Sequence, residues 1–283
     1  MMNELDNQRF NEAYSHFENG KYAQALQGIR DLASGISDPW EKAELLYHEV
    51  IFLLEMHKIS EARQGVLALN KTIAALIQSP TDGNEFDLRI SLPVMARHAE
   101  IRVTSEEGRE PEALQLIEDF VSRYPKQLSM PEFRTMSDEI TTLRGFLLGN
   151  SGRWAEAMPF LEQVPPPEAW RSYHSYYLGR CYCELHEYGR AKEKLVEALN
   201  LGLPGSWAGK AHYHLGIAEY QLSNMNAAKR QFDLSLKTAD EEFLGNSRIW
   251  EWLEATCRNL GLSGEAENFR TLRTGLPTKT KVN

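Results

Sequence analysis

Four residues between positions 174 and 186 have side chains that bind transition metals. They are His174, Cys181, Cys183 and His186, in the segment HSYYLGRCYCELH. On a helix, Cys183 and His186 share one face, and His174 and Cys181 share another. Because the two pairs face in different directions, four ligands do not converge on one ion. The pattern favours small polarisable packing residues, and we predict no metal site and no other cofactor.

Motifs for catalysis are also missing. The sequence has no phosphate loop, Rossmann fingerprint, HExxH or GxSxG. Its Asp and Glu residues are frequent, but their spacing is typical of solvated polar faces. We therefore predict that the protein is not an enzyme. Only Ser79–Pro93, which interrupts the pattern described below, is long enough to help build a polar pocket outside it.

The composition limits the partners. The 283 residues carry 40 Asp and Glu against 31 Lys and Arg, a formal charge of −9. This balance argues against a protein that coats nucleic acid or an anionic membrane. The polar N-terminus does not look like a signal sequence, and the longest apolar run, Val50–Leu54, is far shorter than the ~20 residues that cross a bilayer. With three cysteines, too few for a disulfide framework, the expected location is cytoplasmic.

A short sequence motif recurs along the chain. It consists of a turn followed by a small helix-forming block centred on alanine. The steps between these alanines are 37, 51, 44, 34, 37 and 38 residues, close to the length of a helical hairpin. The seven alanines are Ala25, Ala62, Ala113, Ala157, Ala191, Ala228 and Ala266.

Each repeat of this motif predicts two antiparallel helices. A small residue often lies twelve positions before the alanine, as Gly179 does before Ala191, and we expect it to face that alanine so that the helices approach to ~8–10 Å. Asp38 is the expected N-cap of one helix, with Pro39 in its first turn. Glycines are expected in the turns inside the hairpins, at Gly20, Gly108, Gly152 and Gly264. One hairpin cannot bury its own apolar face, so several must stack.

This pattern resembles the tetratricopeptide repeat family. The match is best from Ser172 to Leu203, where the family motif's Leu-Gly, Tyr, Ala, apolar residue and Ala fall on Leu178-Gly179, Tyr182, Ala191, Leu195 and Ala198. The next unit keeps Leu215-Gly216, Ala228 and Phe232 but has Glu219 in place of the Tyr. The resemblance implies an all-α superhelix, or solenoid, of about seven helical hairpins.

The predicted organisation is one repeat domain over residues 1–275. The repeats are weaker in 5–130 and match better in 131–272, and residues 276–283 form a basic tail that we expect to be disordered. Ser79–Pro93 accounts for the step of 51 residues; it is expected to begin as a loop and to lengthen the helix that follows. The first 56 residues carry ten acids and four bases, whereas residues 270–283 carry four bases and no acid. Head-to-tail self-association and simple solvation of the ends both remain open.

The resemblance also implies where a ligand binds. In this family, contacts lie on the first helix of each hairpin, 18, 15, 11, 8 and 7 residues before the alanine, on the concave face. These positions hold aromatic and basic side chains, which dominate binding hot spots. Basic groups along a groove suit a peptide with an acidic stretch or a free C-terminus. The predicted groove residues are Tyr173, Tyr176, Arg180, Lys210, Tyr213, Ile217, Tyr220, Arg248 and Asn150.

The same offsets in the N-terminal hairpins give a different surface. It is apolar with an acidic edge and includes Phe10, Tyr14 and Glu44. Such a face suits an amphipathic helix or packing against other hairpins. Asn7 and Glu18 do not reproduce the basic clamp that some family members use for chaperone C-termini.

The sequence thus predicts a non-catalytic scaffold that holds a protein or peptide segment in its groove, as an adaptor, a co-chaperone or an assembly factor. Two alternatives stay open: a self-assembling structural subunit, and a peptide-sensing regulator without its own DNA-binding domain.

Overall fold

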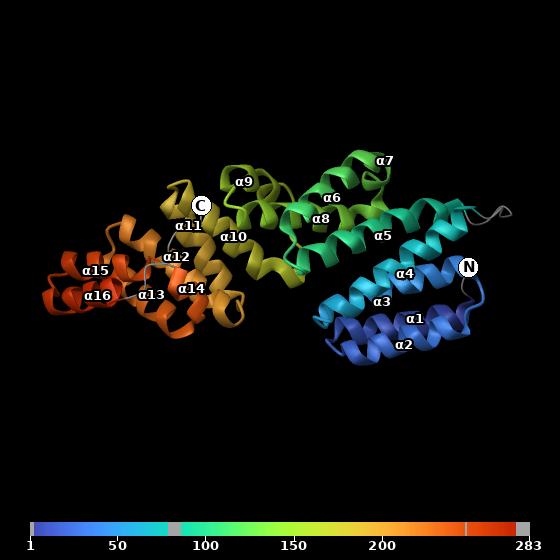
Figure 1. Cartoon of the computed structure of the whole chain (residues 1–283), viewed down its shortest axis with the longest axis horizontal. Helices are drawn as coiled ribbons and strands as arrows, with labels where there is room; N and C mark the ends of the chain where they lie inside the picture. Colours follow the sequence, from blue (N-terminus) through green and yellow to red (C-terminus); the bar gives the residue numbers. More distant parts are fainter. Residues whose placement is uncertain (1–2, 79–85, 247, 276–283) are drawn as a thin grey trace. The chain divides into compact units, whose positions relative to one another are not determined.

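The computed structural model of the chain describes residues 3–78, 86–246 and 248–275. In these residues nearly all of the backbone is helical and no strand occurs, which confirms the predicted all-α class (Figure 1). The described helices form seven hairpins, as the sequence predicts. These are α1 (Glu4–Glu18) with α2 (Tyr22–Gly35), α3 (Pro39–Glu55) with α4 (Ile59–Gln78), α5 (Phe86–Glu106) with α6 (Glu110–Arg123), α8 (Arg134–Asn150) with α9 (Trp154–Gln163), α10 (Arg171–Glu184) with α11 (Tyr188–Asn200), α12 (Gly205–Gln221) with α13 (Met225–Thr238), and α15 (Ile249–Asn259) with α16 (Ser263–Gly275).

Short helices between the hairpins explain the irregular spacing. Helix α7 (Pro125–Leu128) and a 3-10 helix (Pro131–Phe133) precede α8, a second 3-10 helix (Glu168–Trp170) precedes α10, and α14 (Glu241–Asn246) precedes α15. Residues 79–85 lie outside the described part. The helix that follows them, α5, has 21 residues and contains Pro93, so the predicted lengthening is confirmed.

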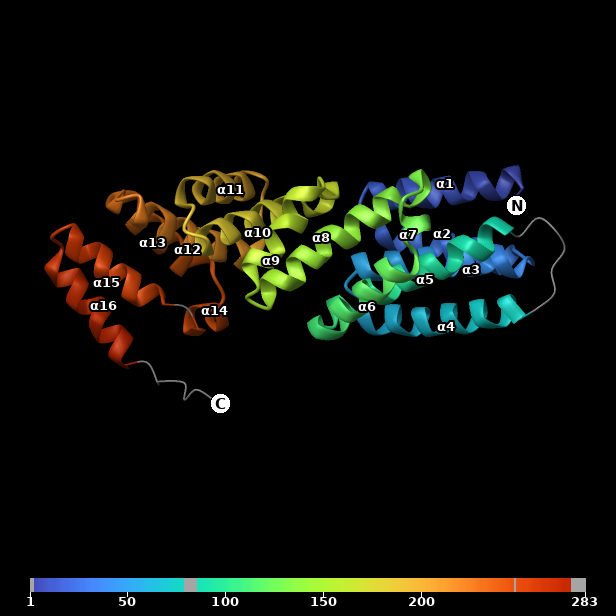
Figure 2. The same ribbon diagram turned by 90° about the horizontal axis from the view of Figure 1, so that it is seen from above.

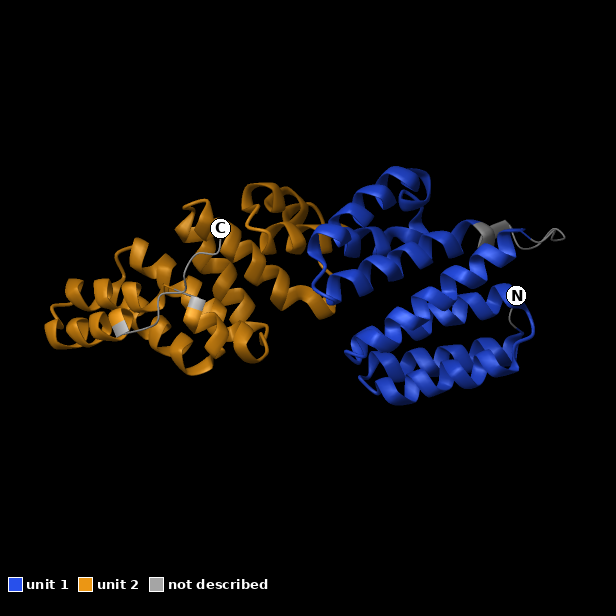
Figure 3. Cartoon of the chain, in the orientation of Figure 1, with its two compact units in different colours: residues 1–140 blue, residues 141–283 orange. Residues whose placement is uncertain are grey.

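The chain divides into two compact units, residues 1–140 and 141–283 (Figure 3). In unit 1, α1 to α4 lie side by side in both views (Figures 1 and 2) and bury a core that includes Trp40, Leu45 and Phe52. In unit 2, Phe232, Ile249 and Leu253 belong to a buried cluster. No helix in the described ranges has the length and apolar character to cross a bilayer. The predicted tail, 276–283, lies outside those ranges.

The seven repeat alanines lie in the interior. Six of them are fully buried, and Ala266 is 4% exposed. The small residues of the first helices meet a different neighbour from the one expected, however. A Cβ atom at Gly179 would lie 2.6 Å from Leu195 Cγ, and one at Gly216 would lie 2.6 Å from the Phe232 ring. The glycines thus approach the apolar residue four positions after the alanine, because the two helices are offset by one turn.

The turns inside the hairpins share one backbone feature. In each, the residue five positions before the repeat alanine has a positive φ, between 54° and 75°, a conformation that favours glycine. Four of the seven turns have glycine there, and Gly261 rather than the expected Gly264 serves the last one. Asp38 accepts hydrogen bonds from the backbone N–H groups of Trp40 and Glu41, which confirms the predicted cap. The seven positive-φ residues are Gly20, His57, Gly108, Gly152, His186, Ser223 and Gly261.

Candidate functional site

Three of the predicted groove residues lie on α10. Tyr173 and Arg180 are half-buried, whereas Tyr176 is only 1% exposed. The rings of Tyr173 and Tyr176 each meet the Trp207 ring edge-on, with centroids 5.3 Å apart. Trp207 belongs to α12, so it joins the predicted positions of two successive hairpins. The sequence analysis missed this residue because Trp207 lies outside the family's contact offsets.

In the part of the chain that the structure describes, Arg180 contacts an aromatic ring and has no carboxylate partner. Its guanidinium carbon lies over the Trp154 ring, 4.2 Å from the centroid. The Nε atom of Arg180 and the hydroxyl of Tyr176 are buried, and each lacks a well-aligned hydrogen bond. Burial raises the pKa of Tyr176, while the charge of Arg180 and a side-chain hydrogen bond between Arg180 and the Tyr176 hydroxyl act to lower it. Among the described residues, no Asp or Glu forms an ion pair with Arg180, although most arginines in that part of the chain have one.

Asn150 is the last residue of α8 and is exposed. Its Oδ1 accepts a hydrogen bond of 2.7 Å from the Tyr177 hydroxyl. A Cβ atom at Gly149 would lie 2.6 Å from the Trp154 ring and 3.2 Å from that of Tyr177, so a glycine is required for both rings to approach α8. The arrangement places an aromatic platform, a guanidinium and a side-chain amide in one part of unit 2.

The predicted residues of α12 are largely engaged with neighbours. Lys210 Nζ lies 4.6 Å from the Trp207 ring centroid and 4.0 Å from Asp240 Oδ2. Tyr213 is 8% exposed, and Ile217 packs against the same core cluster. Tyr220 meets the Trp252 ring at 5.2 Å and accepts a hydrogen bond from Asn259. Arg248, before α15, is exposed and pairs with Glu251.

The candidate metal ligands have separate partners. His174 Nε2 hydrogen-bonds the Leu161 carbonyl, His186 Nδ1 contacts the Tyr188 hydroxyl, and the Cys183 thiol donates to the His214 carbonyl. Burial raises the pKa of the Cys181 and Cys183 thiols to about 12, which keeps both protonated. In the described part of the chain, no three His, Cys, Asp or Glu side chains are placed to hold a metal ion.

Unit 1 contains a polar network that the sequence analysis missed. The Tyr47 hydroxyl contacts His98 Nδ1 at 3.1 Å, and His98 Nε2 lies 2.9 Å from Glu139. Arg102, 6% exposed, donates to Glu139 at 3.2 Å and to Glu55 at 2.9 Å. The network ties α3, α5 and the start of α8 together. Its residues are 37 to 51 positions apart, and only the stacking of hairpins brings them into contact.

The network determines which protonation states are favoured. Burial alone would raise the pKa of Glu139, but the hydrogen bond from His98 and the charge of Arg102 hold it below its usual range. Burial lowers the pKa of His98 while Glu139 acts to raise it; the neutral imidazole that burial favours can donate from Nε2 to Glu139 and accept at Nδ1 from the Tyr47 hydroxyl. Nearby, the Tyr14 hydroxyl lies 2.6 Å from His48 Nδ1, and burial lowers the pKa of His48 to about 4.

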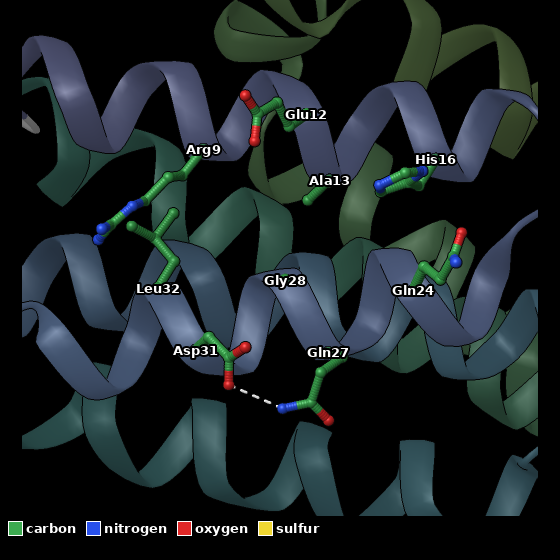
Figure 4. Close-up of a pocket in the computed structure, with 9 residues that line it drawn as sticks. All are labelled: Arg9, Glu12, Ala13, His16, Gln24, Gln27, Gly28, Asp31 and Leu32. Carbon is green, nitrogen blue, oxygen red and sulfur yellow. Dashed lines mark hydrogen bonds between the residues drawn. The ribbon is translucent and has the colours of Figure 1, made fainter.

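A shallow pocket lies between α1 and α2 (Figure 4). Arg9, Glu12 and His16 line it from α1, and Gln27 donates a hydrogen bond to Asp31 on the α2 side. Its floor is closed because Gly28 approaches Ala13. Mixed polar side chains around a shallow floor are typical of a solvent-facing surface, and they define no particular ligand.

Comparisons with known proteins support the fold. No family model matches the sequence, and a search of curated proteins finds no match. Among solved structures, the chain resembles PilF of Pseudomonas aeruginosa (TM-score 0.55, 13% identity, 86% of this chain and 96% of that chain) and the apo form of RapI (0.55, 14%, 98% and 78%). It also resembles a signal transduction ATPase from Pyrococcus horikoshii that has a tetratricopeptide repeat sensor (0.54, 13%, 95% and 43%). At these identities the likeness shows the fold alone.

Proposed function

Since this chain has the helical-repeat fold of the tetratricopeptide repeat proteins, we propose that it is a non-catalytic scaffold that binds a protein or peptide segment. The binding surface is the face of unit 2 that carries the predicted groove residues of α10 and α12. An extended segment lies along these first helices and is held by a few aromatic and cationic anchors.

The observation that carries this proposal is the setting of Arg180. Its guanidinium is half-buried, with Nε fully buried, and pairs with no carboxylate among residues 3–78, 86–246 and 248–275, so it has lost part of its hydration without gaining an ion pair there. Its guanidinium lies over the Trp154 ring, which limits its movement, and an arginine can bind a carboxylate through two N–H groups. The exposed side-chain amide of Asn150, at the end of α8, is a further hydrogen-bond donor on this unit. The ligand chemistry that fits is a carboxylate, from an acidic stretch or a free C-terminus.

The aromatic residues divide into two roles under this proposal. Tyr173 and Tyr220 are half-buried and contact the ligand, together with Ile217 and the exposed Arg248. Tyr176 and Tyr213 are almost fully buried and do not contact the ligand. Under this proposal Tyr176 positions Arg180, and Tyr213 supports the packing of α12. Amphipathic rings of this kind give contact area with little loss of conformational entropy on binding.

The test is a selection from a random peptide library displayed on phage. Wild type should enrich peptides that contain Asp or Glu, or a free C-terminal carboxylate, at low micromolar affinity or better. Arg180→Gln should lose that enrichment by at least tenfold. Arg171→Gln is the matched control, because Arg171 lies on the same helix but is exposed and already paired with Glu168. Equal enrichment by wild type and Arg180→Gln would overturn the proposal.

A further inference from the structure

The connection between α13 and α15 is longer than a hairpin array needs. Between α11 and α12 only four residues, Leu201–Pro204, are required. Between α13 and α15 the chain instead makes a further helix, α14, which is preceded by Ala239 and Asp240. Asp240 caps α14, since its Oδ1 accepts a 2.6 Å hydrogen bond from the Phe243 backbone N–H. We call Ala239–Leu244 the strap.

The strap lies on the predicted groove positions of α12. The Phe243 ring meets the Tyr213 ring at 5.3 Å, nearly perpendicular, and lies 5.9 Å from Lys210 Nζ. Asp240 Oδ2 lies 4.0 Å from the same ammonium group. Gly209 permits this approach, because a Cβ atom there would overlap the backbone of Ala239. The strap therefore covers the two groove residues that begin this hairpin.

The chemistry of the strap matches the ligand proposed above. It presents a carboxylate, Asp240, to a lysine and an aromatic ring, Phe243, three residues later to a tyrosine. The backbone N–H of Phe243, the Ser206 side chain and the Lys210 charge all hold the pKa of Asp240 below its usual value, so the carboxylate is charged at neutral pH. An acidic residue followed by an aromatic one is what a partner segment would use on this surface.

The strap is also weakly attached. Helix α14 has six residues, too few to be stable by itself. Asp240 is exposed, and its ion pair with Lys210 is long and open to solvent. Within the strap, Phe243 and Leu244 pack against the core cluster, the Ala239 backbone lies against Gly209, and Asp240 accepts a hydrogen bond from Ser206. A ligand with the same two groups could therefore displace the strap without unfolding a hairpin.

We propose that the strap is an internal substitute for the partner: it occupies the α12 part of the binding surface until a segment with an acidic residue three positions before an aromatic residue displaces it. This inference rests on the proposed function, which it refines by naming the sequence chemistry of the partner. Binding to α12 then competes with the chain's own residues, and apparent affinity is reduced by the fraction of molecules with the strap closed.

The strap peptide itself is the probe. A fluorescein-labelled peptide KTADEEFLG, residues 237–245, is titrated against the full chain, and its anisotropy is measured. Asp240→Ala/Phe243→Ala should bind it at least tenfold more tightly than wild type. Glu241→Ala/Glu242→Ala is the matched control, because it also removes two side chains from the strap but neither of the groups that contact α12; it should bind like wild type. A peptide with both Asp and Phe replaced by Ala should not bind any of these chains.

Two further variants keep the test decisive. Asp240→Asn removes only the exposed charge and leaves Phe243 packed, so it should fold like wild type and gain about threefold in peptide affinity. Adding Lys210→Glu to the double variant should abolish binding. If the peptide binds wild type and both strap variants equally, or binds none of them, the strap is merely a packing element and the inference is wrong.

The strap-peptide titration and the library selection test different residues, so the strap inference and the proposed function can fail independently. That selection depends on Arg180 in α10, whereas the strap peptide reports on Lys210 and Tyr213 in α12. Acidic peptides lost with Arg180→Gln, combined with no strap-peptide binding, would uphold the scaffold and reject the strap. If instead the strap peptide binds as expected while Arg180→Gln keeps its enrichment of acidic peptides, the anion site lies on α12 and not on α10.

Discussion

Arg102 in unit 1 and Arg180 in unit 2 occupy the same position of their hairpins, eleven residues before the repeat alanine. Arg102 is neutralised by Glu139 and Glu55, which come from neighbouring helices. Arg180 meets a tryptophan ring in place of a carboxylate. The same repeat position thus holds an arginine that forms ion pairs in unit 1, and an arginine that lies over an aromatic ring in unit 2.

The same contrast extends over both units. Residues 1–140 carry 24 acidic and 14 basic side chains, a formal charge of −10, whereas residues 141–283 carry 16 and 17. In unit 1, the residues fifteen before the alanine, Tyr47 and His98, hydrogen-bond each other and lead to Glu139. In unit 2 the equivalent residues, Tyr176 and Tyr213, meet the rings of Trp207 and Phe243 edge-on. The charged network of unit 1 pairs its own arginine, whereas the aromatic packing of unit 2 leaves Arg180 without a carboxylate partner among the described residues.

The largest expected effect comes from making the same change at both arginines. Arg102→Met leaves Glu139 and Glu55 without their cation in a largely buried site, and should lower the free energy of unfolding by about 3 kcal/mol. Arg180→Met strands no carboxylate and loses only the contact with Trp154, so it should cost less than about 1 kcal/mol. Urea denaturation, with hydrogen exchange resolved by unit, measures both. Similar losses at the two sites would mean that the electrostatic contrast is wrong.

The close approach of helices in unit 2 gives the next largest effect. Gly216→Ala would place a Cβ 2.6 Å from the fully buried Phe232 ring, and should destabilise the chain by about 1–3 kcal/mol. Gly189→Ala is the control: it lies in the first turn of α11 with nothing within 4 Å, so the better helix former should stabilise by about 0.5–1 kcal/mol. Thermal unfolding of the two variants should therefore shift in opposite directions; a shift of the same sign would contradict the hairpin geometry.

These features differ in how far the sequence alone could predict them. The repeat alanines, the hairpins and the Asp38 cap depend on local spacing, and the structure has them where they were predicted. The neighbour of Gly179 depends on the offset of two helices, which spacing does not specify, so Leu195 rather than Ala191 lies closest. The composition of the whole chain could not reveal either that Arg102 forms ion pairs whereas Arg180 lies over an aromatic ring. That difference depends on Glu55 and Glu139, which are 47 and 37 residues away from Arg102.

The repeat offsets predict on which helix each candidate residue lies, but they do not predict how exposed its side chain is. A fixed set of offsets identified Arg180 and Tyr173, which the structure leaves half-buried. The same offsets named Tyr176 and Tyr213, which are almost fully buried. Nothing in the spacing indicates that Trp207 and Phe243 lie against them, because Phe243 belongs to a connection that the repeat pattern does not contain.

The pH dependence of the free energy of unfolding tests the buried polar contacts of unit 1, here the contact between His48 and Tyr14. The native pKa of His48 lies at about 4, below the ordinary histidine value of ~6.5. Below pH ~6.5 the unfolded chain therefore binds a proton that the native chain does not, and the free energy of unfolding falls with falling pH until His48 itself titrates. His48→Gln keeps an acceptor for the Tyr14 hydroxyl and cannot titrate. Between pH 6.5 and 5 it should lose about 1–2 kcal/mol less than wild type, measured by urea denaturation; parallel pH profiles would contradict the assignment.

The smallest expected effect concerns a feature that the two units share. His57 in unit 1 and Ser223 in unit 2 occupy the same turn position, with φ of 54° and 65°, where four of the other hairpins have glycine. A side chain in this left-handed conformation costs about 1–2 kcal/mol, and glycine loses part of that gain through the greater entropy of its unfolded chain. His57→Gly and Ser223→Gly should thus each stabilise by about 0.5–1 kcal/mol in thermal unfolding. Because the turns use one backbone geometry whatever the hairpin's surface does, the two gains should be alike and additive. A gain at one site and a loss at the other would mean that the units differ in hairpin geometry as well as in the chemistry that the hairpins carry.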